Sequence, residues 1–89
     1  MVIVKSAAAG TLESSDVYVE VEPANEGICL HLESVVKHQF GEQIEKTVRE
    51  VLAENGVEKA SLRIVDRGAL ECVIRARVET ALVRGKGDA

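Results

Sequence analysis

The 89-residue sequence lacks most of the features that usually reveal a function. It has no tryptophan, and its only aromatic residues are Tyr18 and Phe40, so aliphatic side chains must build the core. Its two cysteines are too few for a disulfide framework. No apolar run approaches the ~20 residues that cross a membrane, and Met1–Lys5 lacks the pattern of a secretion signal. We therefore expect one small cytoplasmic domain that does not bind a membrane.

An excess of basic residues is also missing, because 15 acidic residues outweigh 11 basic ones and the net charge is -4. Binding to nucleic acid requires a basic face that neutralises phosphates, so the sequence predicts no nucleic-acid partner. The glycines form neither of the common phosphate-binding patterns, and nucleotide binding is therefore unsupported. A negative surface does suit a protein partner with a basic docking patch.

The first half of the chain contains two alternating segments and one helical segment. Apolar residues alternate over residues 16–22 and 27–33, and Pro23–Gly27 between them is typical of a turn, so the pattern predicts a hairpin. The period then becomes helical. We expect Ser34 to cap a helix of roughly 17–20 residues that ends at Asn55-Gly56. Its apolar stripe is expected to lie in the core and consists of Phe40, Ile44, Val48, Val51 and Leu52.

The second half predicts another hairpin, with strands before and after a turn at residues 66–68. Residues 70–78 alternate like a strand, although Leu70, Val73 and Ile74 with Ala81 and Leu82 also fit a helical stripe. We favour a strand up to Val78, followed by a short helical turn.

The fold class is therefore α+β, a small single domain in which two β-hairpins flank one central helix packed on an antiparallel sheet. We expect a flexible N-terminal arm over residues 1–15, the domain proper over 16–84 and a frayed tail over 85–89.

Cys29 and His31 are the residues closest to a metal-binding pattern. They lie two apart on one strand face and could point at one ion, but no second Cys/His pair has zinc spacing. His38 and Cys72 could join them only through the fold, and Cys72 is better explained by packing. We predict no metal site.

A catalytic site is no better supported. Ser14, His38 and a carboxylate could be imagined as a triad, but no G-x-S-x-G elbow surrounds Ser14. The arginines are expected to lie on a solvated sheet face, paired with Glu71 and Glu79. They are Arg63, Arg67, Arg75, Arg77 and Arg84.

The most informative segment is Gly10–Asp16, where Ser14 and Ser15 lie between acidic residues just before the first alternating segment. On local sequence alone this is an ordinary serine-containing turn. Glu13 and Asp16, with Glu20 and Glu22 beyond them, would form an acidic patch that a basic partner recognises.

This segment resembles the modification site of the citrate lyase acyl carrier protein (gamma subunit) family. The resemblance extends over nearly the whole chain, in residues 32–34, 39–41, 65–72 and 76–81. It implies that Ser14 carries 2'-(5''-phosphoribosyl)-3'-dephospho-CoA, attached covalently through a phosphodiester by a prosthetic-group transferase. Ser15 is the competing attachment point, and alignment with the family pattern favours Ser14.

The resemblance further implies a non-catalytic carrier subunit. The terminal thiol of its prosthetic group would carry acetyl and citryl thioesters between the alpha (transferase) and beta (lyase) subunits of citrate lyase during cleavage of citrate to oxaloacetate and acetate. One alternative is the acyl carrier subunit of malonate decarboxylase. Another, of a different class, is an unmodified structural or regulatory adaptor that docks through its acidic surface.

Overall fold

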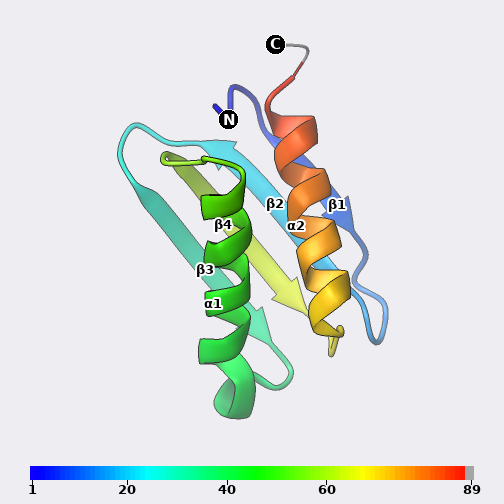
Figure 1. Ribbon diagram of the computed structural model, residues 1–89. Helices are drawn as coiled ribbons and strands as arrows, with labels where there is room; N and C mark the ends of the chain where they lie inside the picture. The colour runs from blue at the N-terminus through cyan, green and yellow to red at the C-terminus, as the bar shows by residue number, and fades with distance from the viewer. Residues whose placement is uncertain (88–89) are drawn as a thin grey trace.

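The computed structural model describes the backbone of residues 1–87 and their side chains except those of residues 37 and 38. Figure 1 shows two helices lying over one face of a twisted sheet. The elements in chain order are β1 (Ala7–Gly10), β2 (Val17–Pro23), β3 (Ile28–Ser34), α1 (Lys37–Glu54), β4 (Ala60–Asp66) and α2 (Glu71–Gly85). The predicted α+β class is confirmed.

The four-stranded sheet has the order β1-β2-β4-β3. β1 and β2 form an antiparallel hairpin, β4 is antiparallel to β2, and β4 is parallel to β3. The sheet is therefore mixed, and α1 forms the crossover that a parallel β3–β4 pair requires.

The predicted hairpin of the first two alternating segments is wrong, because β4 lies between β2 and β3 and pairs with both. Alternation shows which side chains share a face of the sheet, but it does not show which strands are neighbours. The two inner strands, β2 and β4, carry fully buried apolar residues, which include Val19 of β2 with Leu62 and Ile64 of β4.

The predicted second hairpin is also wrong, because residues from Glu71 onward form the helix α2. Its buried residues recur at helical spacing, whereas Leu70 and Cys72 of the proposed strand face are exposed. The face that packs against the sheet and α1 is made of Ile74, Val78, Ala81, Leu82 and Gly85. The helical alternative seen in the sequence is therefore the correct one.

Most of the predicted N-terminal arm belongs to the folded domain. Residues 7–10 form the edge strand β1, and Ile3 is buried in the core. The amides of Val4 and Lys5 donate to the carbonyl of Gly85, at 3.0 and 3.1 Å, so the start of the chain packs against the end of α2. Gly85 is itself buried and was wrongly placed in the tail; residues 88–89 of that tail lie outside the described residues.

The core lies between the sheet and the two helices, and α1 contributes Ile44, Val48, Val51 and Leu52 to it. Phe40, however, is 50% exposed, so its predicted burial is wrong and the buried stripe begins one turn later, at Ile44. The predicted cap is also wrong. α1 begins after Val36, which has no side-chain cap. The Ser34 hydroxyl donates to Asp66 (2.7 Å) and accepts from the Val36 amide (3.1 Å), before the first residue of the helix. The predicted stop is confirmed, since α1 ends at Glu54 before Asn55-Gly56.

Within residues 1–87, neither helix combines the length and apolar character needed to cross a membrane.

Candidate functional site

The loop Thr11–Asp16 joins β1 to β2 at the end of the sheet where β4 also ends (Figure 1). Residues 11–15 are exposed, and Ser14 lies in a turn near the tip. Within the described part of the chain, the Ser14 hydroxyl forms no hydrogen bond. Ser14 therefore presents its hydroxyl to solvent.

Asp16 anchors this loop to the rest of the protein. Its carboxylate accepts hydrogen bonds from the Thr11 hydroxyl (2.7 Å) and the Val17 amide (2.8 Å). The Arg77 guanidinium of α2 donates to the same carboxylate from Nε (3.2 Å) and Nη2 (3.1 Å). These donors, the Thr11 hydroxyl first among them, lower the pKa of Asp16 to about 2. Asp16 is consequently ionised at neutral pH and is held by both ends of its own loop and by α2.

Main-chain hydrogen bonds fix the loop from a second side. The Ser15 amide donates to the carbonyl of Arg67, and the Arg67 amide donates to the carbonyl of Asp16, both at 2.9 Å. Ser15 adopts a φ of 65°, which is uncommon outside glycine and reverses the chain direction just after Ser14. Both serines are exposed, but only Ser15 has its amide committed to a neighbouring segment.

Gly10 closes the hairpin at the base of the loop. Its φ is +92°, and a Cβ added there would lie 1.8 Å from the carbonyl oxygen of Val17. Only glycine permits this approach of the two backbones. The loop is therefore fixed at its base, along its side and at its last residue, while the hydroxyl of Ser14 stays free.

Asp66 is a buried polar residue that the sequence analysis treated only as part of a turn. It is 1% exposed, and its carboxylate accepts hydrogen bonds from the Ser34 hydroxyl (2.7 Å) and from the amides of Gly68 (3.2 Å) and Ala69 (2.9 Å). Asp66 thereby shapes the segment whose Arg67 holds the Ser14 loop. The Asp-x-Gly sequence, typical of a side chain that bonds to the backbone ahead of it, was the available signal.

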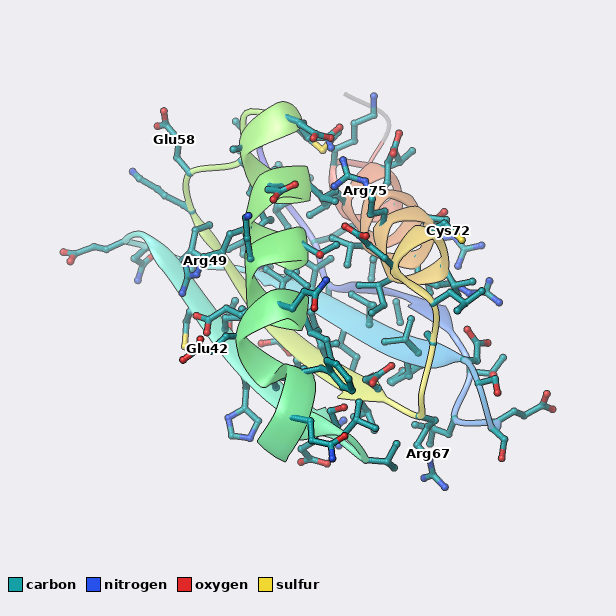
Figure 2. All side chains as sticks on the ribbon, turned by 60° about the horizontal axis from the view of Figure 1, so that its bottom comes forward. Glu42, Arg49, Glu58, Arg67, Cys72 and Arg75 are labelled. Atoms are coloured by element: carbon teal, nitrogen blue, oxygen red, sulfur yellow. The ribbon has the colours of Figure 1, made fainter. Side chains whose placement is uncertain are left out.

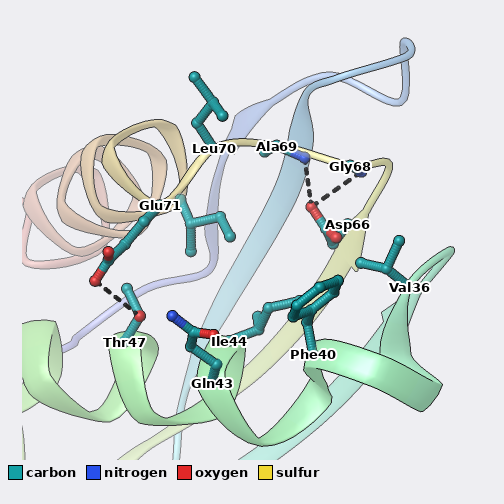
Figure 3. Close-up of a pocket in the computed structure, with 11 residues that line it drawn as sticks. Val36, Phe40, Gln43, Ile44, Thr47, Asp66, Gly68, Ala69, Leu70 and Glu71 are labelled. Atoms are coloured by element: carbon teal, nitrogen blue, oxygen red, sulfur yellow. Dashed lines mark hydrogen bonds between the residues drawn. The ribbon is translucent and has the colours of Figure 1, made fainter.

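A cleft of about 320 Å³ lies beside this segment, between the first half of α1 and the start of α2. Figure 3 shows its lining, which is mostly apolar. It consists of Val36, Phe40, Gln43, Ile44, Thr47, Asp66, Gly68, Ala69, Leu70, Glu71 and Ile74. No sequence pattern predicted this cleft, because its two walls are distant along the chain.

The proposed metal-binding residues do not gather. Cys29 and His31 do share one exposed face of β3, and Cys72 is exposed on α2, so its predicted packing role is wrong. Among the residues that the structure describes, no three His, Cys, Asp or Glu side chains are grouped to hold an ion. The His38 side chain, also named for the imagined triad, lies outside the described residues.

The predicted pairing of the arginines with Glu71 and Glu79 is wrong, because four of the five bind partners on other elements: Arg63, Arg75, Arg77 and Arg84. Arg75 joins α2 to α1 through Glu54 (2.6 Å) and Glu50 (3.4 Å). Arg63 contacts Glu20 across β4 and β2 at 3.3 Å, and Arg84 donates to the carbonyl of Ala8 at 2.8 Å. The predicted acidic patch is also smaller than expected, since Asp16 and Glu20 have arginine partners within the chain.

Comparisons with known proteins agree on the family. Residues 4–85 match the family model described as malonate decarboxylase delta subunit (MdcD). The citrate lyase acyl carrier protein of Escherichia fergusonii is 60% identical over 85 residues, covering 94% of this chain and 88% of that protein. That of Haemophilus influenzae (strain PittEE) is 55% identical over 88 residues, covering 99% and 92%.

A solved structure agrees on the fold. A chain of a Pseudomonas malonate decarboxylase hetero-tetramer in complex with malonate has a TM-score of 0.77 and 22% identity, covering 90% of this chain and 82% of that one. The fold, the full-length identity to the curated relatives and the motif around Ser14 together lead to one conclusion: this chain belongs to the citrate lyase acyl carrier protein family.

Proposed function

We propose that this chain is the acyl carrier subunit of citrate lyase and that Ser14 is the residue to which its prosthetic group is attached. The observation that carries the proposal is the free Ser14 hydroxyl on a loop that is anchored on every other side. A modifying enzyme needs a hydroxyl that it can reach in a reproducible position, and this loop offers one. The full-length identity to citrate lyase acyl carrier proteins selects this function among those that an exposed serine would permit.

The residues around Ser14 fit a phosphoribosyl-dephospho-CoA group joined through a phosphodiester. Residues 11–15 are exposed and leave room for a large substituent. The exposed Arg67, whose backbone is bonded to Ser15, forms no ion pair within residues 1–87 and projects from this end of the molecule (Figure 2). Its guanidinium would favour the phosphates of the group. When attached, the group supplies the thiol that carries acyl cargo as a thioester.

The environment of Ser14 suits a carrier better than a catalyst. Asp16, the nearest anchored carboxylate, is held by hydrogen-bond donors, and its low pKa makes it a poor general base. The chain therefore supplies attachment and position, and tethering keeps the cargo at a high effective concentration near partner active sites. We propose the alpha and beta subunits of citrate lyase and the prosthetic-group transferase as those partners.

The proposal is tested by co-expressing the chain with the prosthetic-group transferase and measuring its intact mass. We expect one adduct with the mass of phosphoribosyl-dephospho-CoA. Ser14→Ala should abolish it, and the matched variant Ser15→Ala should retain it. An adduct that persists in Ser14→Ala overturns the assignment, and a chain that stays unmodified supports the adaptor alternative.

The carrier subunit of malonate decarboxylase is a second candidate, favoured by the family model and by the structural neighbour. The identity of up to 60% to citrate lyase carriers, against 22% to that neighbour, favours the first candidate. The modified chain should support formation of oxaloacetate from citrate with the citrate lyase alpha and beta subunits. Release of CO2 from malonate with the malonate decarboxylase subunits instead would select the second candidate.

A further inference from the structure

The cleft between α1 and α2 has no role in the attachment of a prosthetic group, yet it adjoins the attachment loop. The amide of Ser15 donates to the carbonyl of Arg67, and the next residue, Gly68, is part of the cleft wall. Only the segment at Arg67 and Gly68 therefore separates the Ser14 loop from the cleft, and a flexible group attached to Ser14 can reach the cleft along the same end of the molecule.

The exposed apolar side chains of this region gather at the cleft. Phe40 of α1 is 50% exposed and Leu70, at the start of α2, is 71% exposed, and they form part of its lining. Figure 3 shows Phe40 beside Ile44 on the α1 wall and Leu70 beside Ala69 on the opposite wall, with the Leu70 side chain pointing away from α1. Large apolar side chains left in water beside a cleft are typical of a binding site.

The charges of the lining decide which part of a prosthetic group fits. The cleft contains two carboxylates, Asp66 and Glu71, and none of its lining residues is lysine or arginine. Phosphates are therefore repelled, and the exposed guanidinium of Arg67 outside the cleft suits them better. Gln43 adds a hydrogen-bonding amide to one wall, where the buried Thr47 hydroxyl donates to Glu71 at 3.4 Å. The lining thus matches a neutral chain that combines methyl and methylene groups with amides.

We propose that this cleft binds the neutral, amide-bearing pantetheine end of the chain's own prosthetic group between transfers. The inference rests on the proposed function, because Ser14 provides the tether. Tethering gives an effective concentration on the order of millimolar, so an intrinsic Kd of about 1 mM would already keep the cleft occupied roughly half of the time. The bound state would shield the thiol end from water and release it when a partner subunit competes for it.

The test compares methyl and amide NMR spectra of the unmodified and the modified chain, after intact mass has established whether the group is attached. We expect shifts at Ile44, Ala69, Leu70 and Ile74, and no shifts at Val2, which lies outside the cleft. Free pantetheine, titrated to about 10 mM into the unmodified chain, should move the same cleft signals without any attachment to Ser14.

Ala69→Phe fills the cleft, and it should remove most of both sets of shifts. Ala53→Phe is the matched control, because Ala53 is exposed on α1 and is not part of the cleft wall, and it should leave the shifts unchanged. The circular dichroism spectrum of each variant verifies its fold.

The outcomes separate the two proposals. Cleft signals that move with free pantetheine while no adduct forms would overturn the Ser14 proposal and support the cleft. An attached group that leaves the cleft signals unmoved, with free pantetheine equally without effect, would overturn the cleft. Shifts that survive Ala69→Phe would also overturn it, because the group would then lie elsewhere.

Discussion

The two loops at the ends of β2 differ in how many contacts hold them to the rest of the protein, and their sequences do not predict this difference. Both are short and mostly exposed, and each has a glycine with positive φ beside or within it: Gly10 just before the Ser14 loop and Gly27 in the turn at residues 24–27. The turn at residues 24–27 is tied to the sheet by one main-chain bond, from the Ala60 amide to the Gly27 carbonyl at 3.1 Å. The Ser14 loop is held by Asp16, by Arg67 and by the close approach of Gly10 to Val17. The loop with the proposed function is thus the anchored one.

This contrast suggests that a carrier does not need a mobile attachment point. The prosthetic group supplies the reach, while the protein keeps the base of that group in a defined place. A fixed base loses less conformational entropy when a partner binds it than a disordered arm would.

The largest expected difference between the two loops is in the free energy of unfolding that is lost when alanine replaces Gly10 or Gly27. Gly10→Ala combines a positive φ with a Cβ 1.8 Å from the Val17 oxygen, so the free energy of unfolding should fall by roughly 3 kcal/mol or more. Gly27→Ala has φ +58° but meets no atom within 4 Å, and should cost about 1 kcal/mol or less. Urea unfolding measures both. Equal losses would show that the base of the Ser14 loop is not constrained.

The next difference concerns the rate at which the transferase modifies Ser14. Arg77→Gln releases Asp16 from α2, and we expect modification to slow roughly tenfold, which corresponds to about 1.4 kcal/mol of positioning. Arg63→Gln is the matched control, because it removes the same charge from an exposed pair with Glu20. Its rate should equal that of the unaltered chain. Equal slowing in both variants would point to net charge as the cause.

The pH dependence of stability should reveal the anchor at Asp16. Its pKa in the folded protein, about 2, lies below the ordinary value of 3.8, so its contribution is complete above about pH 4 and is lost as the pH falls toward 2. Melting temperatures between pH 2 and 4 should therefore fall less steeply in Asp16→Asn than in the unaltered chain. At pH 7 this variant should melt lower, whereas Glu26→Gln in the opposite turn should not. Parallel pH profiles would contradict the anchor.

The smallest effects are expected at the loop tips. Ser14→Ala and Asn25→Ala remove exposed side chains, so each should change the free energy of unfolding by no more than about 0.5 kcal/mol. Only Ser14→Ala should abolish modification. A clear loss of stability in Ser14→Ala would mean that its hydroxyl has a structural partner.

The sequence predicted those features that depend on local pattern. Alternation located β2, β3 and β4, and the helical stripe from Ile44 to Leu52 located the buried part of α1. The order of the strands could not be predicted, because alternation does not identify neighbours. α2 was mistaken for a strand because Leu70, Cys72 and Ile74 fit a period of two, while Leu70, Val73 and Ile74 fit a helical stripe equally well.

The candidate site was predictable only in part. A local motif identified Ser14. The contacts that hold its loop could not be predicted, because the paired residues are far apart in the sequence: Arg77 is 61 residues from Asp16, and Ser34 is 32 residues from Asp66. Such pairs form only when the fold brings α2 to the Ser14 loop and the end of β3 to the end of β4. Phe40 was predicted to lie in the core because an apolar stripe on a helix does not show which of its residues other elements cover. In the structure Phe40 is half exposed and lines the cleft.

The most direct test of the central claim is fragmentation of the modified, unaltered chain to locate the added mass. The account predicts fragments ending at Glu13 without the adduct and fragments ending at Ser14 with all of it. Added mass that first appears at Ser15, or at any residue outside the Thr11–Asp16 loop, would contradict the claim that Ser14 is the attachment point.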